Sequence, residues 1–410
     1  MKKNLHLQTG SALLLLLLLS TLVSTAIALS AWKNSNTRHE HEQKTQFALQ
    51  RAKEAIIAFA AADATLPGRL PCPEDVSRIG SATEGTAQLC SNSSMHAGRI
   101  AWRTLGLDEP RDATGEQLWY VLSPGFRGSA TTPINSESIG QLMIDSQTVG
   151  AVALIIAPGA PLPGQNRTTP TTASPPDIAQ YLDGTNADND YSFTATSVNG
   201  ISNDRVLAIY PTDLMATVEK RVANEVRYAL LEYYCGTGKV DATGNCTTLP
   251  LNGYFPRPSA FSDANCLGNT KIQFPNCASM ATGNEGRIPA NPLTAWDGSS
   301  ILRGNGPPTT WFQQNGWREL VYYAVAPACI EGTTGCSGAG YLTLRRPGSP
   351  EMTNARVAIV VSGNNLGAAS RNKSRVADYF EEQNASVGDN IFTQWPVVAG
   401  AFNDQLVVIP

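Results

Sequence analysis

The 410-residue sequence is poor in histidine and in charge, and both shortages exclude classes of function. It has four histidines, and only His96 lies beyond the first fifty residues. A Ser-His-Asp or Cys-His site cannot form within the second half of the chain, because the general base is missing. Charged residues are 16% of the chain, the formal net charge is −4, and no basic stripe follows the first residues. We therefore predict a protein that is not an enzyme and has no nucleic-acid partner.

Proline and glycine are absent from residues 11–66. Residues 11–32 also carry no charge, and about 20 apolar helical residues can cross a bilayer. Beyond them, apolar residues recur at three- and four-residue steps between Ala48 and Phe59, the period of one helix face. We expect one helix over 11–63, membrane-spanning and then amphipathic, although a separate helix beginning near Glu40 is the alternative. The predicted transmembrane part includes Ala12, Leu15, Leu19 and Trp32.

Residues 1–10 form a short polar leader that ends in Gly10, directly before the apolar stretch. This junction resembles the prepilin-peptidase site of type IV pilins and type II secretion pseudopilins. The resemblance implies cleavage between Gly10 and Ser11, N-methylation of Ser11 and retention of the helix. The family commonly has glutamate at mature position 5, where this chain has Leu15, and that departure points to a minor subunit. A secretory signal peptide cut near Ala28 and a plain single-pass anchor are the alternatives.

The remainder of the chain contains an internal duplication. Six short segments of the first half recur in the same order in the second half; LWYVLSP at 118–124, for example, parallels VYYAVAP at 321–327. Matches near the ends of the halves lie about 200 residues apart, whereas the helical match of 51–61 with 221–233 is offset by 170. Ordered self-similarity predicts two tandem copies of one domain, the second with an insertion early in its head.

The duplication sets the expected domains and fold class. Each copy shows a helical pattern followed by short strand-like runs between Gly, Pro, Asn and Asp clusters. A helix packed on an antiparallel sheet makes an α+β layer, which is also the pilin-like architecture that the resemblance implies. We expect α+β tandem heads behind a long N-terminal helix. The expected segments are a leader (1–10), a spine helix (11–63), a first head (64–211) and a second head (212–410) with its own helix at 213–234.

The eight cysteines fall in close pairs along the sequence. An even number after an export segment suggests disulfides formed in an oxidising compartment. Zinc binding would need CxxC or histidine spacing, which the sequence lacks. Eight cysteines allow 105 connectivities, and we expect sequential pairing. The expected pairs are Cys72/Cys90, Cys235/Cys246, Cys266/Cys277 and Cys329/Cys336.

One acidic loop, 183–190 (DGTNADND), is a candidate calcium site. Its five oxygen-bearing side chains suit calcium, although their spacing is not that of an EF-hand. Some type II secretion pseudopilins carry calcium in a late loop of the head, so the resemblance favours the metal. An ordinary turn-rich loop is the alternative, and no other cofactor is expected. The candidate ligands are Asp183, Thr185, Asn186, Asp188 and Asp190.

Taken together, these features resemble a minor pilin or pseudopilin of a type IV pilus or type II secretion filament. The resemblance implies three partners, namely other pilins or pseudopilins, prepilin peptidase and the inner membrane. It also implies that the N-terminus is cytoplasmic and that the heads are periplasmic or at the cell surface. Leu15 lacks the charge of the family's glutamate, and doubled heads are hard to repeat along a thin filament, so a tip or initiation subunit is expected. The alternative is an exported or membrane-anchored two-domain binding or adhesin-like protein outside any filament.

Overall fold

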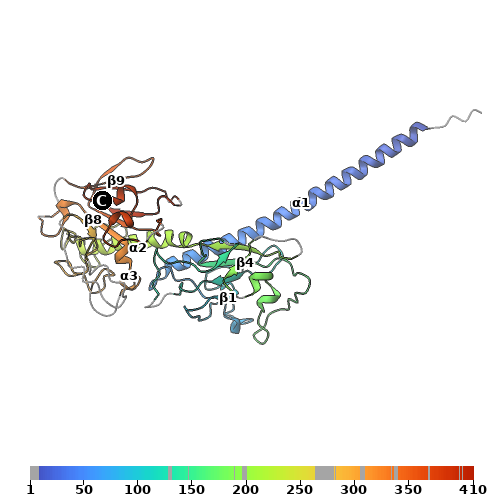
Figure 1. The fold of residues 1–410 in the computed structure, drawn as a ribbon, viewed down its shortest axis with the longest axis horizontal. Coiled ribbons are helices and arrows are strands. Elements are labelled where there is room, and N and C mark those ends of the chain that lie inside the picture. Colours follow the sequence, from blue (N-terminus) through green and yellow to red (C-terminus); the bar gives the residue numbers. More distant parts are fainter. Residues whose placement is uncertain are drawn as a thin grey trace, which may run out of the picture.

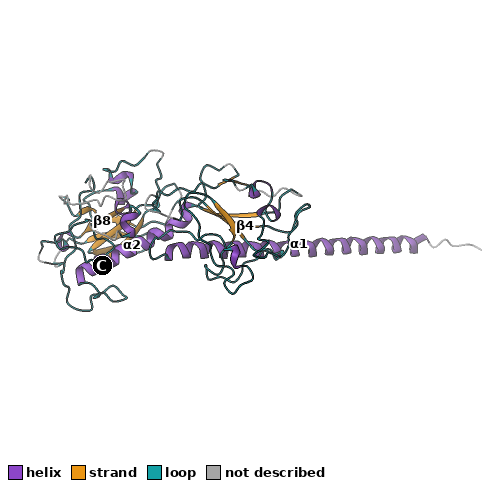
Figure 2. Cartoon of the chain, turned by 90° about the horizontal axis from the view of Figure 1, so that it is seen from below, coloured by secondary structure: helices purple, strands orange, loops and turns teal. Residues whose placement is uncertain are grey.

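The computed structural model places a projecting helix, a first head and a second head one after another along a common axis (Figures 1 and 2). It describes residues 9–127, 132–145, 147–188, 190–195, 201–263, 281, 283–304, 310–333, 335, 336, 340–367, 370–396, 398 and 400–410, and within the first helix it describes side chains at 16–25 and from 38 onward. We keep the names first head for residues 64–211 and second head for 212–410; these boundaries remain predictions.

Helix α1 runs from Thr9 to Ala62, 54 residues, or about 80 Å at 1.5 Å per residue. The lack of proline and glycine after Gly10 permits this length, because neither residue interrupts the hydrogen-bond ladder. After the helix, Gly68 has a positive φ of 98° and donates its N–H to the carbonyl oxygen of Ala60 at 2.9 Å. The C-terminal part of α1 is packed against the rest of the protein, and its buried side chains are Leu49, Ala52, Ile56, Ala60 and Ala61.

The predicted transmembrane segment and inner-membrane location are wrong. No helix in the described part of the chain is both long and apolar enough to cross a membrane. The described side chains of the expected span cover residues 16–25, about half of the roughly 20 residues that a span needs. Four of them are Ser or Thr. Of the side chains predicted to lie in the bilayer, Leu19 is exposed, and those of Ala12, Leu15 and Trp32 lie outside the described residues.

Each head is built on a four-stranded antiparallel sheet, and both sheets follow one strand plan. Strands β4 and β11 are buried at every residue, which explains their continuous apolar runs. The first sheet has the order β1 (His96–Arg99), β2 (Trp119–Leu122), β4 (Ala153–Ala157), β6 (Arg205–Ile209). The second has the order β7 (Glu285–Arg287), β8 (Val321–Val325), β11 (Val357–Val361), β13 (Gln405–Ile409).

Two smaller sheets lie beside the large ones. In the first head β3 (Met143–Ile144) pairs in parallel with β5 (Ser192–Phe193). In the second head β9 (Leu342–Arg345) pairs in parallel with β12 (Ile391–Thr393) and antiparallel with β10 (Met352–Ala355).

The expected fold class is therefore wrong in two respects. It included a membrane-spanning helix, and it gave each pilin-like head a single antiparallel sheet. The described chain is rich in sheet, divided into four separate sheets, and two of these contain parallel pairs. The physical reason is that long loops return across each head and add short pairs. Pairs of two or three residues are too short to show a period-2 pattern.

Helix α2 (Pro211–Cys235) covers β11 and β13 of the second head, as α1 covers β4 and β6 of the first. It begins two residues before the predicted 213–234 because Pro211 suits a first helical turn, and the Asp213 carboxylate accepts the N–H of Tyr210 at 2.9 Å. Two short helices, α3 (Trp311–Gln314) and α4 (Trp317–Leu320), lead into β8. The described 3-10 turns are Val76–Arg78, Ile178–Gln180, Gly184–Ala187, Pro327–Cys329, Val376–Asp378 and Glu382–Ala385.

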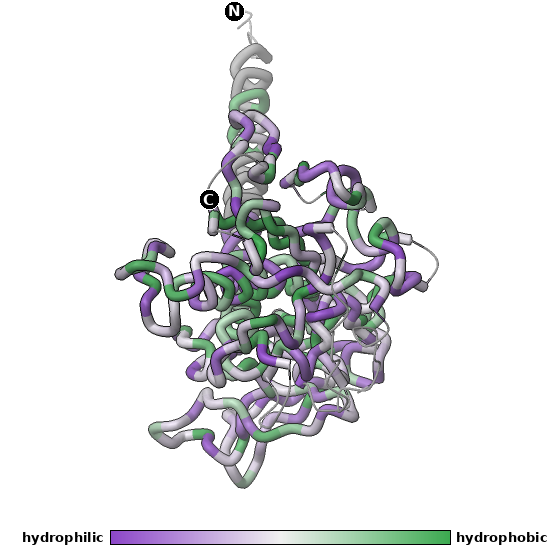
Figure 3. The backbone as a smooth tube through the Cα atoms, turned by 90° about the vertical axis from the view of Figure 1, so that its left-hand side faces the viewer, coloured by the Kyte–Doolittle hydropathy of each residue, from purple (hydrophilic) through white to green (hydrophobic). Residues whose placement is uncertain are grey.

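One hydrophobic core continues from the first head into the second. Ile134 and Met215 both approach Gly68, so a loop of the first head, the start of α2 and the end of α1 meet there. A second cluster, which includes Trp119 and Tyr181, fills the other face of the first sheet. In Figure 3 hydrophobic stretches gather in the interior, and hydrophilic residues recur along the outer loops.

Candidate functional site

The part of α1 that projects from the first head carries exposed apolar side chains (Figure 1), and we call residues 16–25 the leucine segment. Residues three, four and seven apart share one face of a helix, so Leu16, Leu19 and Val23 lie in line. Leu18 and Leu22 lie beside them. Such an apolar stripe on a helix marks a contact face. Its large apolar side chains, Leu16, Leu17, Leu18, Leu19, Leu22 and Val23, are all between 55% and 71% exposed.

The hydroxyl groups of the leucine segment bond to the helix itself. Ser20 donates to the carbonyl oxygen of Leu17 at 2.8 Å, and Ser24 donates to that of Ser20 at 2.8 Å. Thr25 donates to the carbonyl oxygen of Thr21 at 2.6 Å. Because these hydroxyls are satisfied without water, an apolar partner can cover the segment without leaving them unpaired.

The predicted processing site lies at the very start of α1. Gly10 and Ser11 belong to its first turn, and the side chain of Ser11 lies outside the described residues. Cleavage between them stays a prediction.

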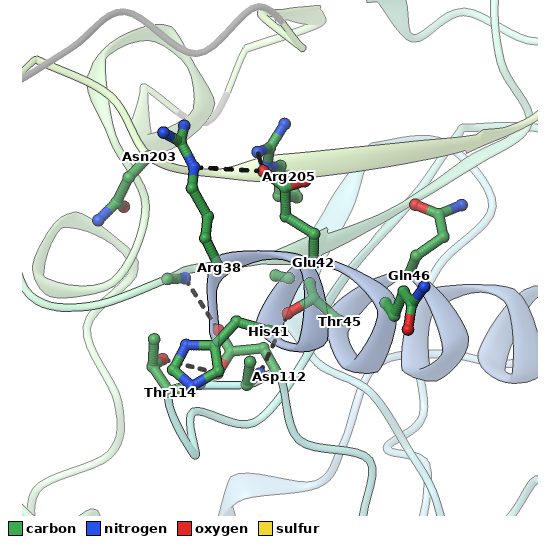
Figure 4. A pocket seen from close by; sticks show the side chains of 13 residues that line it. Arg38, His41, Glu42, Thr45, Gln46, Asp112, Thr114, Asn203 and Arg205 are labelled. Carbon is green, nitrogen blue, oxygen red and sulfur yellow. Dashed lines mark hydrogen bonds and ion pairs between the residues drawn. The ribbon is translucent and has the colours of Figure 1, made fainter. Parts of the chain in front are cut away.

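A groove of about 800 Å³ opens where α1 enters the first head (Figure 4). Glu42 on α1 lies between two guanidinium groups, with its Oε1 3.6 Å from Arg38 Nε and 3.4 Å from Arg205 Nη2. Opposite, the buried Asp112 carboxylate accepts backbone N–H groups from Thr114 and Gly159 at 2.8 and 2.9 Å. Glu42 is therefore paired with both guanidinium groups, whereas the Asp112 carboxylate is held by backbone N–H groups.

A cavity of about 600 Å³ lies between the two heads. Beside it, Ile134 donates its N–H to Asn315 Oδ1 at 2.9 Å, and Asn135 Nδ2 donates to the Asn315 carbonyl oxygen at 2.7 Å. Arg371 Nη1 lies 3.4 Å from Glu137 Oε1. Side chains from both heads therefore hold this junction together.

Glu219 of α2 is buried at the same junction. Burial raises the pKa of its carboxyl to about 8, with a smaller contribution in the same direction from Glu381. The Ser136 hydroxyl and the Arg371 charge oppose that shift. A carboxyl with this pKa is mostly protonated at neutral pH, so Glu219 is buried without a net charge.

The structure does not gather the five candidate calcium ligands. Asp183 and Asn186 are buried, whereas Thr185, Asp188 and Asp190 are exposed. The Asp183 carboxylate accepts the side-chain amide of Gln165 and the N–H of Asn203, both at 2.8 Å, and Asp190 accepts the N–H of Ser192 at 2.7 Å. No group of three or more His, Cys, Asp or Glu side chains in the described residues could hold a metal ion. Calcium binding stays a prediction.

A buried aspartate holds this loop, and the sequence reasoning missed it. Asp204 Oδ2 accepts the N–H of Asp183 and the side-chain amide of Asn186, both at 2.9 Å. Burial raises the pKa of the Asp204 carboxyl to about 7.

The second head repeats the arrangement around Asp404. Its Oδ2 accepts the N–H of Glu381 and the side-chain amide of Asn384, both at 3.0 Å. Burial and the neighbouring Glu381 hold the pKa of Asp404 well above its usual range. The Asn-Asp pair that precedes the last strand of each half was the available sequence signal.

Three of the sequential cysteine pairs are disulfide-bonded. The bridges join Cys72 to Cys90, Cys235 to Cys246 and Cys329 to Cys336. The fourth expected pair, Cys266 and Cys277, lies outside the described residues.

His96 in β1 lies beside two serines. Its Nε2 is 3.3 Å from Ser91 Oγ and 3.1 Å from the Ser91 carbonyl oxygen. A carbonyl oxygen only accepts, so Nε2 carries the proton in that contact and cannot also take one from a serine. This geometry does not favour nucleophilic catalysis at His96.

Comparison with family models, with curated proteins and with solved structures found no match for this chain.

Proposed function

We propose that this chain is a structural subunit of a filament of the type IV pilus or type II secretion class, in the manner of a minor pilin or pseudopilin. The observation that carries the proposal is the leucine segment, an exposed apolar stripe on a helix that extends beyond the first head (Figure 1). The leader that ends at Gly10 supports it. No enzymatic activity is part of the proposal.

The partner of the leucine segment is the helix of another pilin-like subunit. Covering one exposed leucine stabilises a complex by about 1.5–3 kcal/mol, so a stripe of several leucines strongly favours association. Side chains at three- and four-residue steps form ridges that fit the grooves of a second helix. Before assembly, prepilin peptidase would cut before Ser11 and leave this stripe in the mature protein. A terminal position fits Leu15, which lacks the charge that a glutamate would offer to the next subunit.

The mature N-terminus tests the class of protein. Mass spectrometry of the protein from the cells that make it should find a chain beginning at N-methylated Ser11. A chain that begins near Leu29 or Ala31 would instead identify an exported two-domain protein outside any filament. An intact Met1 would also contradict the proposal, because prepilin peptidase would not have acted.

Changes within the leucine segment test its role. Serine at Leu16, Leu19 and Val23 together should reduce co-sedimentation with the filament at least tenfold, since the lost burial is worth several times the roughly 1.4 kcal/mol that a tenfold change needs. Leu89→Ser is the matched control, because Leu89 is 97% exposed on a loop of the first head. Equal co-sedimentation of both variants would contradict the proposed contact.

A further inference from the structure

Helices α1 and α2 lie side by side and run in the same direction. Lys53 Nζ bonds to Asp213 Oδ2 at 2.8 Å, and Arg221 donates to the carbonyl oxygen of Ala61. Both contacts join residues 160 positions apart. Because the offset is constant over two turns, the helices are parallel where they touch.

The duplication itself has a different offset, 170 residues. We call α1 with the first sheet the first unit and α2 with the second sheet the second unit. At this offset of 170 residues, which the sequence comparison of the two helices gives, buried positions in α1 match buried positions in α2. The matched pairs are Leu49 with Glu219, Ala52 with Val222, Ile56 with Val226, and Ala60 with Leu230.

Residues that touch across the two helices are 160 positions apart, whereas equivalent residues of the two units are 170 positions apart. This difference of ten residues means that the second unit is displaced along α1. Ten helical residues correspond to about 15 Å. Two copies of one domain, parallel and displaced by a fixed distance along their helices, form the arrangement that would generate a filament if it continued. The contact between the two units of this chain is therefore one example of the contact that would join neighbouring units of such a filament.

Arg221 is the polar centre of this internal contact. It donates to the carbonyl oxygens of Ala61 and, at 2.6 Å, Asp63, at the C-terminal end of α1. Helix C-termini present unpaired carbonyls and partial negative charge, so a guanidinium is a suitable cap. The counterpart of Arg221 in the first unit is Arg51, whose side chain is 54% exposed. Its ion pair with Asp108, at 3.8 Å, is a surface pair of little strength.

The C-terminal end of α2 is capped by donors from its own unit, and we call it the closed end. The counterpart of Asp63 is Tyr233, whose carbonyl oxygen already accepts the side-chain amide of Asn252 at 2.6 Å. The carbonyl oxygen of Cys235 accepts the N–H of Leu251 at 3.2 Å. These donors belong to the segment that follows α2, which the Cys235–Cys246 disulfide fastens to the helix. In the first unit the corresponding place is taken by Arg221 of the second unit.

We propose that the face of α1 around Arg51 is the docking site for the C-terminal end of the helix of one related subunit. That subunit would be placed relative to the first unit as the first unit is placed relative to the second. This inference rests on the proposed function. The partner's helix would lie about 15 Å further toward the N-terminus of α1 and would cover the leucine segment. One neighbour binds on that side and none at the closed end, so the chain occupies the end of its filament.

Site-specific photo-crosslinking in cells that assemble the filament tests the site. We would place p-benzoylphenylalanine at position 19, 51 or 252 of the full chain, in place of Leu19, Arg51 or Asn252. Position 51 should crosslink to the end of the N-terminal helix of a subunit that carries a prepilin leader, identified from the crosslinked peptide. Position 252 should give no crosslink to such a subunit.

The three positions separate the possible failures. Crosslinks to subunits from both 51 and 252 would overturn the closed end. A crosslink from 19 without one from 51 would overturn the Arg51 site and leave the filament function standing. The absence of crosslinks from both 19 and 51 would overturn the filament function together with this inference.

A charge reversal provides a second measurement. Arg51→Glu should reduce incorporation into filaments about tenfold or more, because a charge-assisted hydrogen bond is replaced by repulsion from a helix C-terminus. Arg345→Glu is the matched control, since Arg345 is a similarly exposed arginine in β9 of the second head that pairs with Glu351. Unchanged incorporation of Arg51→Glu would overturn the site.

Discussion

At the scale of single residues, the second unit differs from the first by a buried acid. Glu219 stands where α1 has Leu49, and it meets Ser136 and Arg371 at the junction of the heads. An apolar side chain would fill this place without a titratable group. The acid therefore makes the junction sensitive to pH, because burial favours its neutral form.

The first prediction concerns the stability of the Glu219 site. Its pKa is about 8 in the folded chain and 4.5 ordinarily, so the folded state binds the proton more tightly. The stability from this group is complete below pH 4.5 and is lost as the pH rises to 8, by on the order of 3 kcal/mol. Glu219→Gln should remove that loss, as urea unfolding at pH 5 and pH 8 would show.

The control for this prediction is Glu225→Gln, a half-exposed position on the same helix. It should leave the pH dependence of unfolding as in the unmodified chain. If Glu219→Gln and Glu225→Gln lose the same free energy between pH 5 and pH 8, Glu219 is not the titrating group.

The second prediction concerns the repeated aspartates. Asp404→Ala leaves the N–H of Glu381 and the amide of Asn384 without their acceptor, which costs about 1–3 kcal/mol for each unpaired buried group. Asp204→Ala should cost a similar amount, because it accepts the matching two donors in the first head. The comparison is Asp190→Ala, an exposed turn residue whose loss should cost under about 0.5 kcal/mol in a thermal melt.

At the scale of elements, strands with strong apolar runs could be located from the sequence. The observed bounds of β8 and β13 coincide with the runs VYYAV and QLVVI. The edge strands β1 and β7, with sequences HAGR and EGR, carry no such pattern. Each has a glycine at a crowded position: an added Cβ would lie 2.9 Å from Pro73 Cβ at Gly98 and 2.0 Å from the Ser259 carbonyl oxygen at Gly286.

The candidate site was predictable only in part. The apolar stretch of the first helix was evident in the sequence, but which surfaces stay exposed depends on where the heads pack. The parallel contact between the two helices depends on Arg221 and Asp213 meeting residues 160 positions earlier, which no local pattern reveals. The buried aspartates were missed because isolated Asp in a loop usually serves a turn.

The third prediction concerns the segment that closes the end of α2. Replacing Cys235 and Cys246 by serine removes a short-range bridge worth about 2–4 kcal/mol. The loop after α2 should then become the first site of proteolysis, with cleavage mapped by mass spectrometry. The same replacement at Cys72 and Cys90 should leave that loop resistant, because this bridge lies in the first head. Equal cleavage patterns would contradict a fastening role.

At the scale of the whole molecule, the two heads share one core. Tandem domains of this size usually unfold in separate steps, because few contacts cross their boundary. Here the apolar cluster is continuous across the heads, and the side chain of Asn315 accepts the N–H of Ile134 at the junction. The pairing of Arg221 with the end of α1 adds a polar contact.

The fourth prediction is that the described heads unfold together. A calorimetric scan of the full chain under oxidising conditions should show one transition, followed equally by a probe in either head. Ile134→Ala should lower the free energy of unfolding by about 2–4 kcal/mol and move both probes, since Ile134 is fully buried between the heads. Ile139→Ala, five residues along the same loop and 77% exposed, should change neither. Two separate transitions in the unmodified chain would mean that the heads are independent, and the fixed displacement of the second unit along α1 would then lose its support.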